Sequence, residues 1–300
     1  MIYRLSGRGM ATQEHALVDR ATRAACAAAH RFGIRDFTPV VLGGYSNTLV
    51  RIAPHPIVAR VATLASTTRD CASAMAREIA VGLALAQEGA ASVRPSNLLP
   101  PGPHEEQNLW LSFWTHLNTK PERATPFQAG QQLRALHESL AQTGIKLPHL
   151  TPFYEGQAIV ADHPGRRLDV EARRRVVMEF EVVRQRIEGE CGVQPLHGDA
   201  HYGNLMLTDK GCIWGDLEDT CSGPVEWDLA CLTASSRVFG RGRAASEALA
   251  GYGRQFDQER LDLMIRARVL QAVSWALVAL PDPAHDLRLL ARLRWLFGSR

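Results

Sequence analysis

The first 120 residues contain short runs of apolar positions separated by turn residues. Five such runs predict β-strands, at 39–42, 48–52, 57–62, 96–99 and 109–113. Two predicted helices accompany them. One is the Ala-rich run 11–31. The other is 67–87, where Met75, Ile79 and Leu83 place an apolar residue at every fourth position. This part of the chain therefore predicts a small lobe of sheet and helix.

Beyond residue 118, helical periodicity dominates the chain. Helices are predicted at 126–142, 169–189 and 224–237, and in three segments from about residue 244 to the end. A turn-rich stretch at 195–223 interrupts them. This order predicts an α+β fold, with a small N-terminal lobe at 1–117 and a larger, mainly helical C-terminal lobe at 118–300. A hinge is expected at about 112–120, and clefts between lobes are favoured ligand sites.

Composition and charge exclude several classes of protein. Of the 300 residues, 46% are hydrophobic and 22% charged, which is usual for a globular protein and excludes a disordered chain or a coiled coil. A net charge of +3 argues against a strongly basic nucleic-acid binder. Residues 1–20 lack the apolar region of a signal peptide, and the apolar run 269–280 is too short to cross a bilayer. We therefore expect no membrane partner. The six cysteines form no CxxC pair, so we expect reduced thiols and a cytoplasmic location.

The stretch 196–230 carries the groups that indicate chemistry. Asp199 follows a His-Gly pair, Asn204 comes five residues later, and Asp216 ends the next apolar run. The two apolar runs flank a turn at 209–211 and are expected to pair as a hairpin. Transfer of a phosphoryl group from a nucleotide requires divalent cations held by oxygen ligands, and a residue that orients the attacking hydroxyl. The D-x-x-x-x-N spacing is that of the protein-kinase catalytic loop, and Asp216 takes the place of the next metal-binding aspartate.

The wider pattern resembles the aminoglycoside phosphotransferase-like family. The shared order is H-G-D-x-x-x-x-N, then an aspartate that ends a strand, then G-P-x-x-x-D-L-A at 223–230. This family includes antibiotic kinases, choline kinases and homoserine kinases. The resemblance is strong over 196–230, moderate over 42–88 and weak after 237. It implies a bilobal, protein-kinase-like fold and a phosphotransferase that uses ATP and Mg²⁺ to phosphorylate a hydroxyl group.

The resemblance also implies a role for each matching residue of this stretch. Asp199 would be the catalytic base. Asn204 and Asp216 would bind Mg²⁺. Asp228 would be a structural acid that braces the catalytic loop through hydrogen bonds to backbone N–H groups, and His197 would help to fix the geometry of that loop.

Two positions depart from the family pattern, and some neighbours have open roles. Leu217 stands where the family usually has an aromatic residue, and Tyr202 stands where it often has proline. Neither change removes a chemical group that the reaction needs. Glu218 either reaches a metal or a cationic substrate, or one or both of Glu218 and Asp219 are solvated. His137 resembles a Leu-His signature of the family at the end of a helix and is expected to be structural.

The same resemblance places the nucleotide on the N-terminal lobe. The chain has no GxxxxGK[ST] sequence, which excludes a P-loop. Alone, the turn at 43–47 would predict only a hairpin, but the family has a phosphate-covering loop at this place. Gly44, Ser46 and Asn47 fit that role through backbone amides and small polar side chains. The backbone at 113–115 is expected to bind the adenine edge, as a kinase hinge does.

Lysine is scarce, and this restricts the choice of a phosphate clamp. The first of only three lysines is Lys120, so a cation in the N-terminal lobe must be an arginine. Arg60 stands where protein kinases have lysine, and Glu78, 18 residues later on the next helix, would pair with it. The alternatives are an exposed Arg60 on an edge strand and a surface pair of Glu78 with Arg77 or Arg69.

Three functions remain open at this point. The first is a kinase for a small-molecule hydroxyl, with an aminoglycoside, another antibiotic or an endogenous alcohol as the acceptor. A polycationic aminoglycoside would need an acidic pocket, and candidate carboxylates for it are Glu155, Asp162, Glu218, Asp219 and Glu226. The second is a protein Ser/Thr kinase of the bacterial stress type, which the short segment between Asp216 and Pro224 disfavours. The third is a non-catalytic nucleotide sensor, which the retained Asp199, Asn204 and Asp216 disfavour.

Overall fold

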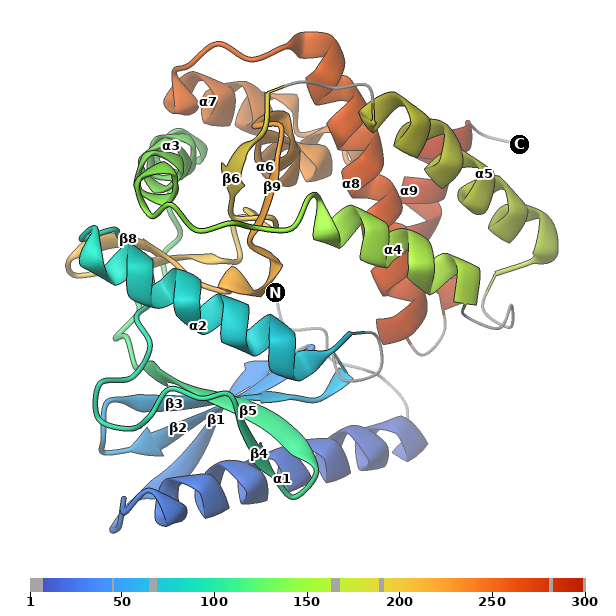
Figure 1. Cartoon of the computed structure of the whole chain (residues 1–300). Helices are drawn as coiled ribbons and strands as arrows, with labels where there is room; N and C mark the ends of the chain where they lie inside the picture. Colours follow the sequence, from blue (N-terminus) through green and yellow to red (C-terminus); the bar gives the residue numbers. More distant parts are fainter. Residues whose placement is uncertain are drawn as a thin grey trace. The chain divides into compact units, whose positions relative to one another are not determined.

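The computed structural model describes residues 8–44, 46–64, 69–162, 168–188, 192–280 and 283–298 (Figure 1). Contacts within the chain divide it into two compact units, Met1–Thr119 and Lys120–Arg300. The N-terminal unit contains a five-stranded sheet, and the C-terminal unit is mainly helical. The fold is therefore α+β, as the hydrophobic pattern predicts.

The sheet of the N-terminal unit is antiparallel throughout, with the strand order β1-β2-β3-β5-β4. Its strands are β1 (Thr38–Gly44), β2 (Asn47–Ala53), β3 (Ile57–Ala62), β4 (His104–Glu106) and β5 (Leu109–Thr115). Helices α1 (Arg8–Arg31) and α2 (Cys71–Gln87) lie on opposite faces of this sheet (Figure 1). The helices therefore cover both faces of the central strand β3, which is buried at all but one of its positions.

The alternation of side chains along β3 decides which helix each residue meets. Ala59 and Val61 point to the face that packs against the buried alanines of α1. Arg60 and Ala62 point to the opposite face, where they meet α2. Successive residues of a strand face opposite sides of a sheet. The register that buries the apolar neighbours of Arg60 therefore also directs its guanidinium toward α2.

Two expectations for the N-terminal unit differ from the structure. The strand predicted at 96–99 is wrong, because the hydroxyl of Ser96 accepts hydrogen bonds from the two N–H groups that close a turn there, at 3.2 and 3.3 Å. Strand β4 was not predicted, since its His-Glu-Glu sequence has no apolar signal. Helix α2 begins at Cys71, where Asp70 caps its N-terminus. The predicted start at 67 lies outside the described residues.

The C-terminal unit is built from helices around a turn-rich insert. The helices are α3 (Pro126–Gln142), α4 (Thr151–Asp162), α5 (Val170–Ile187), α6 (Glu226–Val238), α7 (Gly242–Tyr252), α8 (Gln258–Ala279) and α9 (Leu287–Phe297). The insert holds strands β6 (Gln194–Leu196), β7 (Leu205–Thr208), β8 (Gly211–Trp214) and β9 (Cys221–Gly223), with a short 3₁₀ helix η2 (Leu217–Asp219). β6 pairs with β9. β7 pairs with β8, which confirms the predicted hairpin.

Helices α3 and α7 cross at short range because each has a glycine at the contact. A Cβ added to Gly130 would lie 2.0 Å from a carbonyl oxygen of α7, and one added to Gly251 would lie 2.0 Å from a carbonyl oxygen of α3. Any larger residue would push the helices apart. The crossing brings Tyr252, at the end of α7, to within 3.0 Å of His137 on α3.

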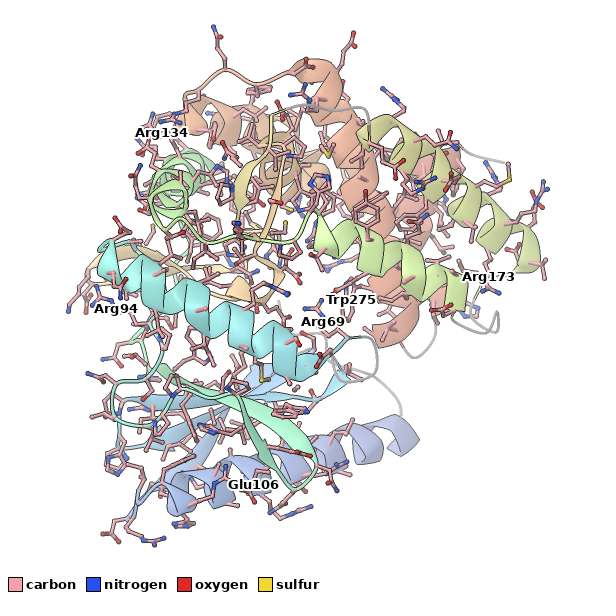
Figure 2. All side chains as sticks on the ribbon, in the orientation of Figure 1. Arg69, Arg94, Glu106, Arg134, Arg173 and Trp275 are labelled. Carbon is pink, nitrogen blue, oxygen red and sulfur yellow. The ribbon has the colours of Figure 1, made fainter. Side chains whose placement is uncertain are left out.

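Helix α8 lies inside the C-terminal unit, packed against α4, α5, α6 and α9 (Figure 1). Arg173 of α5 (Figure 2) donates hydrogen bonds to the carbonyl oxygens of Val160 and Ala161 at the end of α4. Helix α4 was not predicted, because Pro152 and Gly156 interrupt its apolar pattern. Of the described helices, none is both long and apolar enough to cross a membrane.

Candidate active site

Asp199 lies in the loop between β6 and β7, and its carboxylate is held on both oxygens. Nδ2 of Asn204 donates to Oδ2 at 3.2 Å and to the backbone carbonyl of Asp199 at 3.0 Å. Nη2 of Arg268, which comes from α8, donates to Oδ1. His201 adds its Nε2 at 3.4 Å from Oδ2. The side chain of Asp199 is 18% exposed, so it is partly open to an incoming group.

The charges around Asp199 keep it ionised. Burial alone would raise the pKa of Asp199, but the positive charge of Arg268 opposes burial, with smaller contributions from His201 and His197. Together with the hydrogen bond from Asn204, they hold the pKa of Asp199 below its ordinary value. A carboxylate of this kind is available as a hydrogen-bond acceptor at neutral pH.

Gly198 is the tightest point of the catalytic loop. Its φ is +85°, and an added Cβ would lie 1.8 Å from the carbonyl oxygen of Asp219. Glycine is therefore required both for the backbone angle and for the close approach of the two segments. The carbonyl oxygen of Gly198 accepts a hydrogen bond from Nε1 of the fully buried Trp227, at 2.7 Å. Sequence reasoning quoted this glycine in the motif but gave it no role.

Asp228 fixes the same loop from α6. Its Oδ2 accepts the N–H of His197 at 2.7 Å, and its Oδ1 accepts the N–H of Gly198 at 2.9 Å. Nε2 of His137 lies 2.8 Å from Oδ2, and Nδ1 of His137 lies 3.0 Å from the hydroxyl of Tyr252. Asp228 is fully buried. A buried carboxylate with these partners holds the backbone that precedes Asp199, which is the contact expected of a brace.

His197 connects the loop to the next strand. Its Nδ1 accepts the N–H of Asp199 at 3.3 Å, which leaves Nε2 as the donor to the carbonyl oxygen of Gly215 at 3.0 Å. Gly215 in turn donates its N–H to the carbonyl oxygen of Asn204 at 2.9 Å. The segments that carry Asp199, Asn204 and Asp216 are therefore linked by backbone and imidazole hydrogen bonds.

Asn204 and Asp216 have the donor chemistry that Mg²⁺ prefers. Nδ2 of Asn204 faces Asp199, so its Oδ1 is turned away and, among the described residues, has no hydrogen-bond donor. Asp216 follows β8 in the left-handed conformation, with φ 59° and ψ 61°, which aspartate tolerates better than most residues. Among the described residues, no cluster of three or more His, Cys, Asp and Glu side chains could hold a metal alone. Mg²⁺ commonly uses one or two protein oxygens together with phosphates and water, which fits this pair.

Arg60 and Glu78 form a buried ion pair in the N-terminal unit. Nη1 of Arg60 donates to Oε2 of Glu78 at 2.8 Å, and the two side chains are 7% and 3% exposed. Arg60 lies on the central strand β3 and Glu78 on α2, so both surface alternatives are wrong. The strand register opposes Arg60 to Ser112 on β5. The pairing follows from the sheet and the helix, while the role of Arg60 as a phosphate clamp stays a prediction.

The other nucleotide candidates have mixed outcomes. Gly44 ends β1, and Asn47 begins β2 with a buried side chain whose Nδ2 donates to the hydroxyl of Ser46 at 3.2 Å. The residue between Gly44 and Ser46 lies outside the described residues. The expected adenine contact at 113–115 stays a prediction, but two of the N–H groups there are not available for it. The N–H groups of Phe113 and Thr115 already donate to carbonyl oxygens of the N-terminal unit, at 2.8 and 2.9 Å.

The acidic neighbours of the loop are not solvated. Glu218 and Asp219 are 9% and 8% exposed, which excludes the solvated alternative. Oε1 of Glu226 accepts the N–H of Asp257 at 2.9 Å, so Glu226 stabilises the start of α8.

Arg268 is the contact of Asp199 that sequence reasoning missed. Its only signal was a single arginine next to the apolar run 269–280.

The residues of this loop have the chemistry for phosphoryl transfer. A unit of sheet and helix, followed by a helical unit that carries such a loop, is the architecture of a kinase-like phosphotransferase. The chain belongs to the phosphotransferase enzyme family, whose model matches residues 38–264. It is therefore a phosphotransferase of the kinase type. No curated protein is significantly similar to the chain.

Solved structures of several kinases share the fold. The amicoumacin kinase hAmiN, in complex with AMP-PNP, Ca²⁺ and Ami, has a TM-score of 0.70 and 14% identity over 94% of this chain and 95% of its own. Choline kinase LicA from Streptococcus pneumoniae has 0.65 and 11% over 91% and 97%. The aminoglycoside phosphotransferase APH(3'')-Id from Streptomyces rimosus has 0.57 and 16% over 83% and 98%. Identities this low establish the fold and leave the acceptor open.

Proposed function

We propose that the protein transfers the γ-phosphoryl group of ATP to a hydroxyl of a small molecule, with Asp199 as the catalytic base and Mg²⁺ as cofactor. The observation that carries this proposal is the environment of Asp199. Its carboxylate is partly exposed and ionised, and the loop that bears it is fixed from α6 by Asp228. A group of this kind can orient a hydroxyl and accept its proton.

The reaction balances without a further reactant. The acceptor oxygen forms a bond to the γ-phosphorus, and the bond from that phosphorus to the β–γ bridging oxygen breaks. The hydroxyl proton passes to Asp199 and then to solvent, so ATP and R–OH give ADP, the phosphate ester of R–OH and one proton. The carboxylate acts mainly by holding the hydroxyl in line, since positioning and charge stabilisation supply most of the catalysis in phosphoryl transfer.

The remaining polar residues would serve the phosphates. Bound Mg²⁺ would neutralise negative charge on the transferring group, with Oδ1 of Asn204 and the carboxylate of Asp216 as its protein ligands. Arg60, held by Glu78, would contact the phosphates through the fork of N–H donors that arginine offers. The backbone and hydroxyl of Ser46 and the amide of Asn47 would cover them from the β1–β2 turn.

Two features support a small acceptor that carries few positive charges. Only η2 and β9 lie between Asp216 and Pro224, where a protein kinase has a long activation segment that binds peptides. The cation Arg268 lies directly against Asp199, and Glu226 is occupied at the start of α8. Aminoglycosides and other antibiotics remain candidates. We rank neutral hydroxyl compounds above polycations, because an ammonium next to the reacting hydroxyl would face Arg268.

Asp199→Asn tests the proposal. It keeps the shape but removes the base, and its single oxygen can accept from only one of Asn204 and Arg268. General-base loss lowers kcat by roughly 10²- to 10⁴-fold. The measurement is ADP release from Mg²⁺–ATP in the presence of aminoglycosides, other antibiotics, amino alcohols and neutral polyols. Asp209→Asn is the matched control. Asp209 lies on the β7–β8 turn, its side chain is 86% exposed, and its carboxylate pairs with Lys120. This substitution should leave kcat unchanged.

Full turnover by a folded Asp199→Asn variant would contradict the role of Asp199. Mg²⁺-dependent ATP binding by the wild type, without phosphoryl transfer to any acceptor or to water, would instead indicate the sensor function. Phosphorylation of peptides but of no small alcohol would favour the protein-kinase alternative.

A further inference from the structure

Arg268 connects the candidate base to a helix far away in the chain. Its Nη2 donates to Oδ1 of Asp199, 69 residues earlier, and its Nη1 donates to Oε1 of Gln271, one turn later on α8. The side chains of Arg268 and Asp199 are 14% and 18% exposed. The pair is therefore largely shielded from water. An ion pair in such a place is stronger than one at the surface.

The two oxygens of Asp199 are held by different parts of the C-terminal unit. Oδ2 is held by Asn204 of the same loop, and Oδ1 is held by Arg268 of α8. One donor would leave the carboxylate free to rotate about the bond to its Cβ atom. Two donors on opposite oxygens fix this rotation, so the lone pairs that remain have one direction. The reach of a base to a hydroxyl depends on that direction.

The anchor of Arg268 is rigid. Helix α8 packs against four other helices, and the residues that flank Arg268 on it, Ala267 and Val269, are buried. Gln271 binds the second guanidinium nitrogen and limits its rotation. Trp275, labelled in Figure 2, follows seven residues after Arg268 and hence on the same face of α8. This face of α8 is fixed relative to the loop by the packing of the unit.

We propose that Arg268 is a positioning residue for the reaction, which holds the carboxylate of Asp199 in the one orientation that meets the acceptor hydroxyl. This inference rests on the proposed function, since it assigns a direction to the base named there. It differs from the clamp at Arg60: Arg268 acts through Asp199 and does not bind the nucleotide.

The opposing interpretation is an ion pair that only stabilises the unit, and helix α8 itself supplies the control. Arg266, two residues earlier, donates to Oε1 of Glu179 and to the carbonyl oxygen of Leu296, away from Asp199. Its side chain is 33% exposed, and its partner Glu179 is 17% exposed. Arg266→Gln and Arg268→Gln therefore each remove one shielded ion pair from the same helix, and only the second touches the base.

The experiment compares kcat, KM for ATP and melting temperature among Arg268→Gln, Arg268→Lys and Arg266→Gln. ADP release is measured with the best acceptor from the screen and with water. Arg268→Gln should lower kcat by about 10- to 100-fold, since misplacing a reacting group by about an ångström costs rates of this order. KM for ATP should change less than about twofold, because nucleotide binding is untouched. Arg268→Lys should recover part of kcat, and Arg266→Gln should lower only the melting temperature.

Three outcomes overturn the inference. One is an unchanged kcat in folded Arg268→Gln. A second is a loss of kcat in both Arg268→Gln and Arg266→Gln that is proportional to the loss of melting temperature in each. If Arg268→Gln does not fold, Arg268→Lys decides, and wild-type kcat in that variant is the third. A wild type with no ATP turnover at all refutes the proposed function, and this inference with it. Turnover that depends on Asp199 but not on Arg268 refutes the inference alone.

Discussion

Each unit of the protein buries one arginine–carboxylate pair at its candidate functional residues, and we propose opposite roles for the two pairs. In the N-terminal unit, Glu78 holds Arg60, and the arginine is the group proposed to contact phosphates. In the C-terminal unit, Arg268 holds Asp199, and the carboxylate is the group proposed to contact the acceptor. The same ion pair thus presents a cation in one unit and an anion in the other.

The difference lies in the neighbours of each pair. Arg60 lies on strand β3 and Glu78 on the next helix, α2, and the pair is almost completely buried. Asp199 sits on a loop whose backbone is fixed by Asp228 and by the contact of Gly198 with Asp219. An ion pair alone does not reveal which partner is the working group. The elements that hold each partner, and the exposure that remains, decide it.

The largest expected effect distinguishes the loops of the two units. In Gly198→Ala, the new Cβ meets the carbonyl oxygen of Asp219 at 1.8 Å, and the loop must move or unfold. We expect loss of phosphoryl transfer by more than about 10³-fold, since the base and its braces would all shift. Gly43→Ala is the matched variant in the N-terminal unit. Its φ is also positive, at +125°, but nothing lies within 4 Å of the added Cβ.

Chemical denaturation and ADP release measure the two glycine variants. The backbone angle alone should cost Gly43→Ala about 1 kcal/mol of unfolding free energy. Equal losses of stability in the two variants would show that the backbone angle is the main cost at both positions. The close contact at Gly198 would then not distinguish the two loops.

The second effect compares the two ion pairs directly. Removal of the arginine, as in Arg60→Met or Arg268→Met, takes its ion-pair partner from a shielded carboxylate and should lower the unfolding free energy by about 3–5 kcal/mol. Removal of both partners, as in Arg60→Met/Glu78→Leu or Arg268→Met/Asp199→Leu, should restore most of that stability. Neither double variant should recover activity, because each lacks its working group. Urea denaturation and ADP release give the two readouts.

These double-variant cycles can also break the comparison. If Arg60→Met/Glu78→Leu regained both stability and kcat/KM, Arg60 would be a packing residue rather than a phosphate clamp. The two pairs would then differ in kind, and only the C-terminal pair would serve the reaction.

The smallest effect concerns the hydrogen-bonded chain Tyr252–His137–Asp228, which supports the loop of Asp199 in the C-terminal unit. Burial raises the pKa of Tyr252 to about 12, and the negative charge of Asp228 adds to this effect. The stability that this phenol contributes is complete below its unfolded pKa of about 10 and is lost as pH rises through the folded pKa. Tyr252→Phe should cost about 1 kcal/mol at pH 7 through the lost hydrogen bond.

The test of this brace is the difference in unfolding free energy between the wild type and Tyr252→Phe, measured in urea at several pH values. The difference should shrink between pH 10 and about 12. A constant difference across this range would show that Tyr252 does not titrate with the fold and does not support His137 as a neutral phenol.

Much of the fold could be predicted because its signals are local. The limits of α3 match the prediction at 126–142, and the three last helices follow their periodic patterns. The strand predicted at 96–99 failed, since a serine that binds its own backbone overrides a short apolar run. Helix α4 escaped prediction because proline and glycine lie inside it.

The candidate site could be predicted in part. The spacing of Asp199, Asn204 and Asp216 is fixed by one short loop and one hairpin, so the sequence alone placed these groups near one another. The pair of Arg60 and Glu78 could also be inferred, because a strand and the helix after it have few ways to pack. The adenine contact at 113–115 stays a prediction, although the N–H groups of Phe113 and Thr115 are bound within the N-terminal unit.

The sequence by itself determined most of the secondary structure, the phosphotransferase family and the residues of the predicted catalytic loop, because all of these depend on neighbours within a few tens of positions. The tertiary structure alone decided that Arg268 holds Asp199, that Gly198 lies against Asp219, and that Tyr252 supports His137. These contacts join segments that are 21 to 115 residues apart. They depend on how α3, α6, α7 and α8 cross, and no local pattern of residues fixes a crossing.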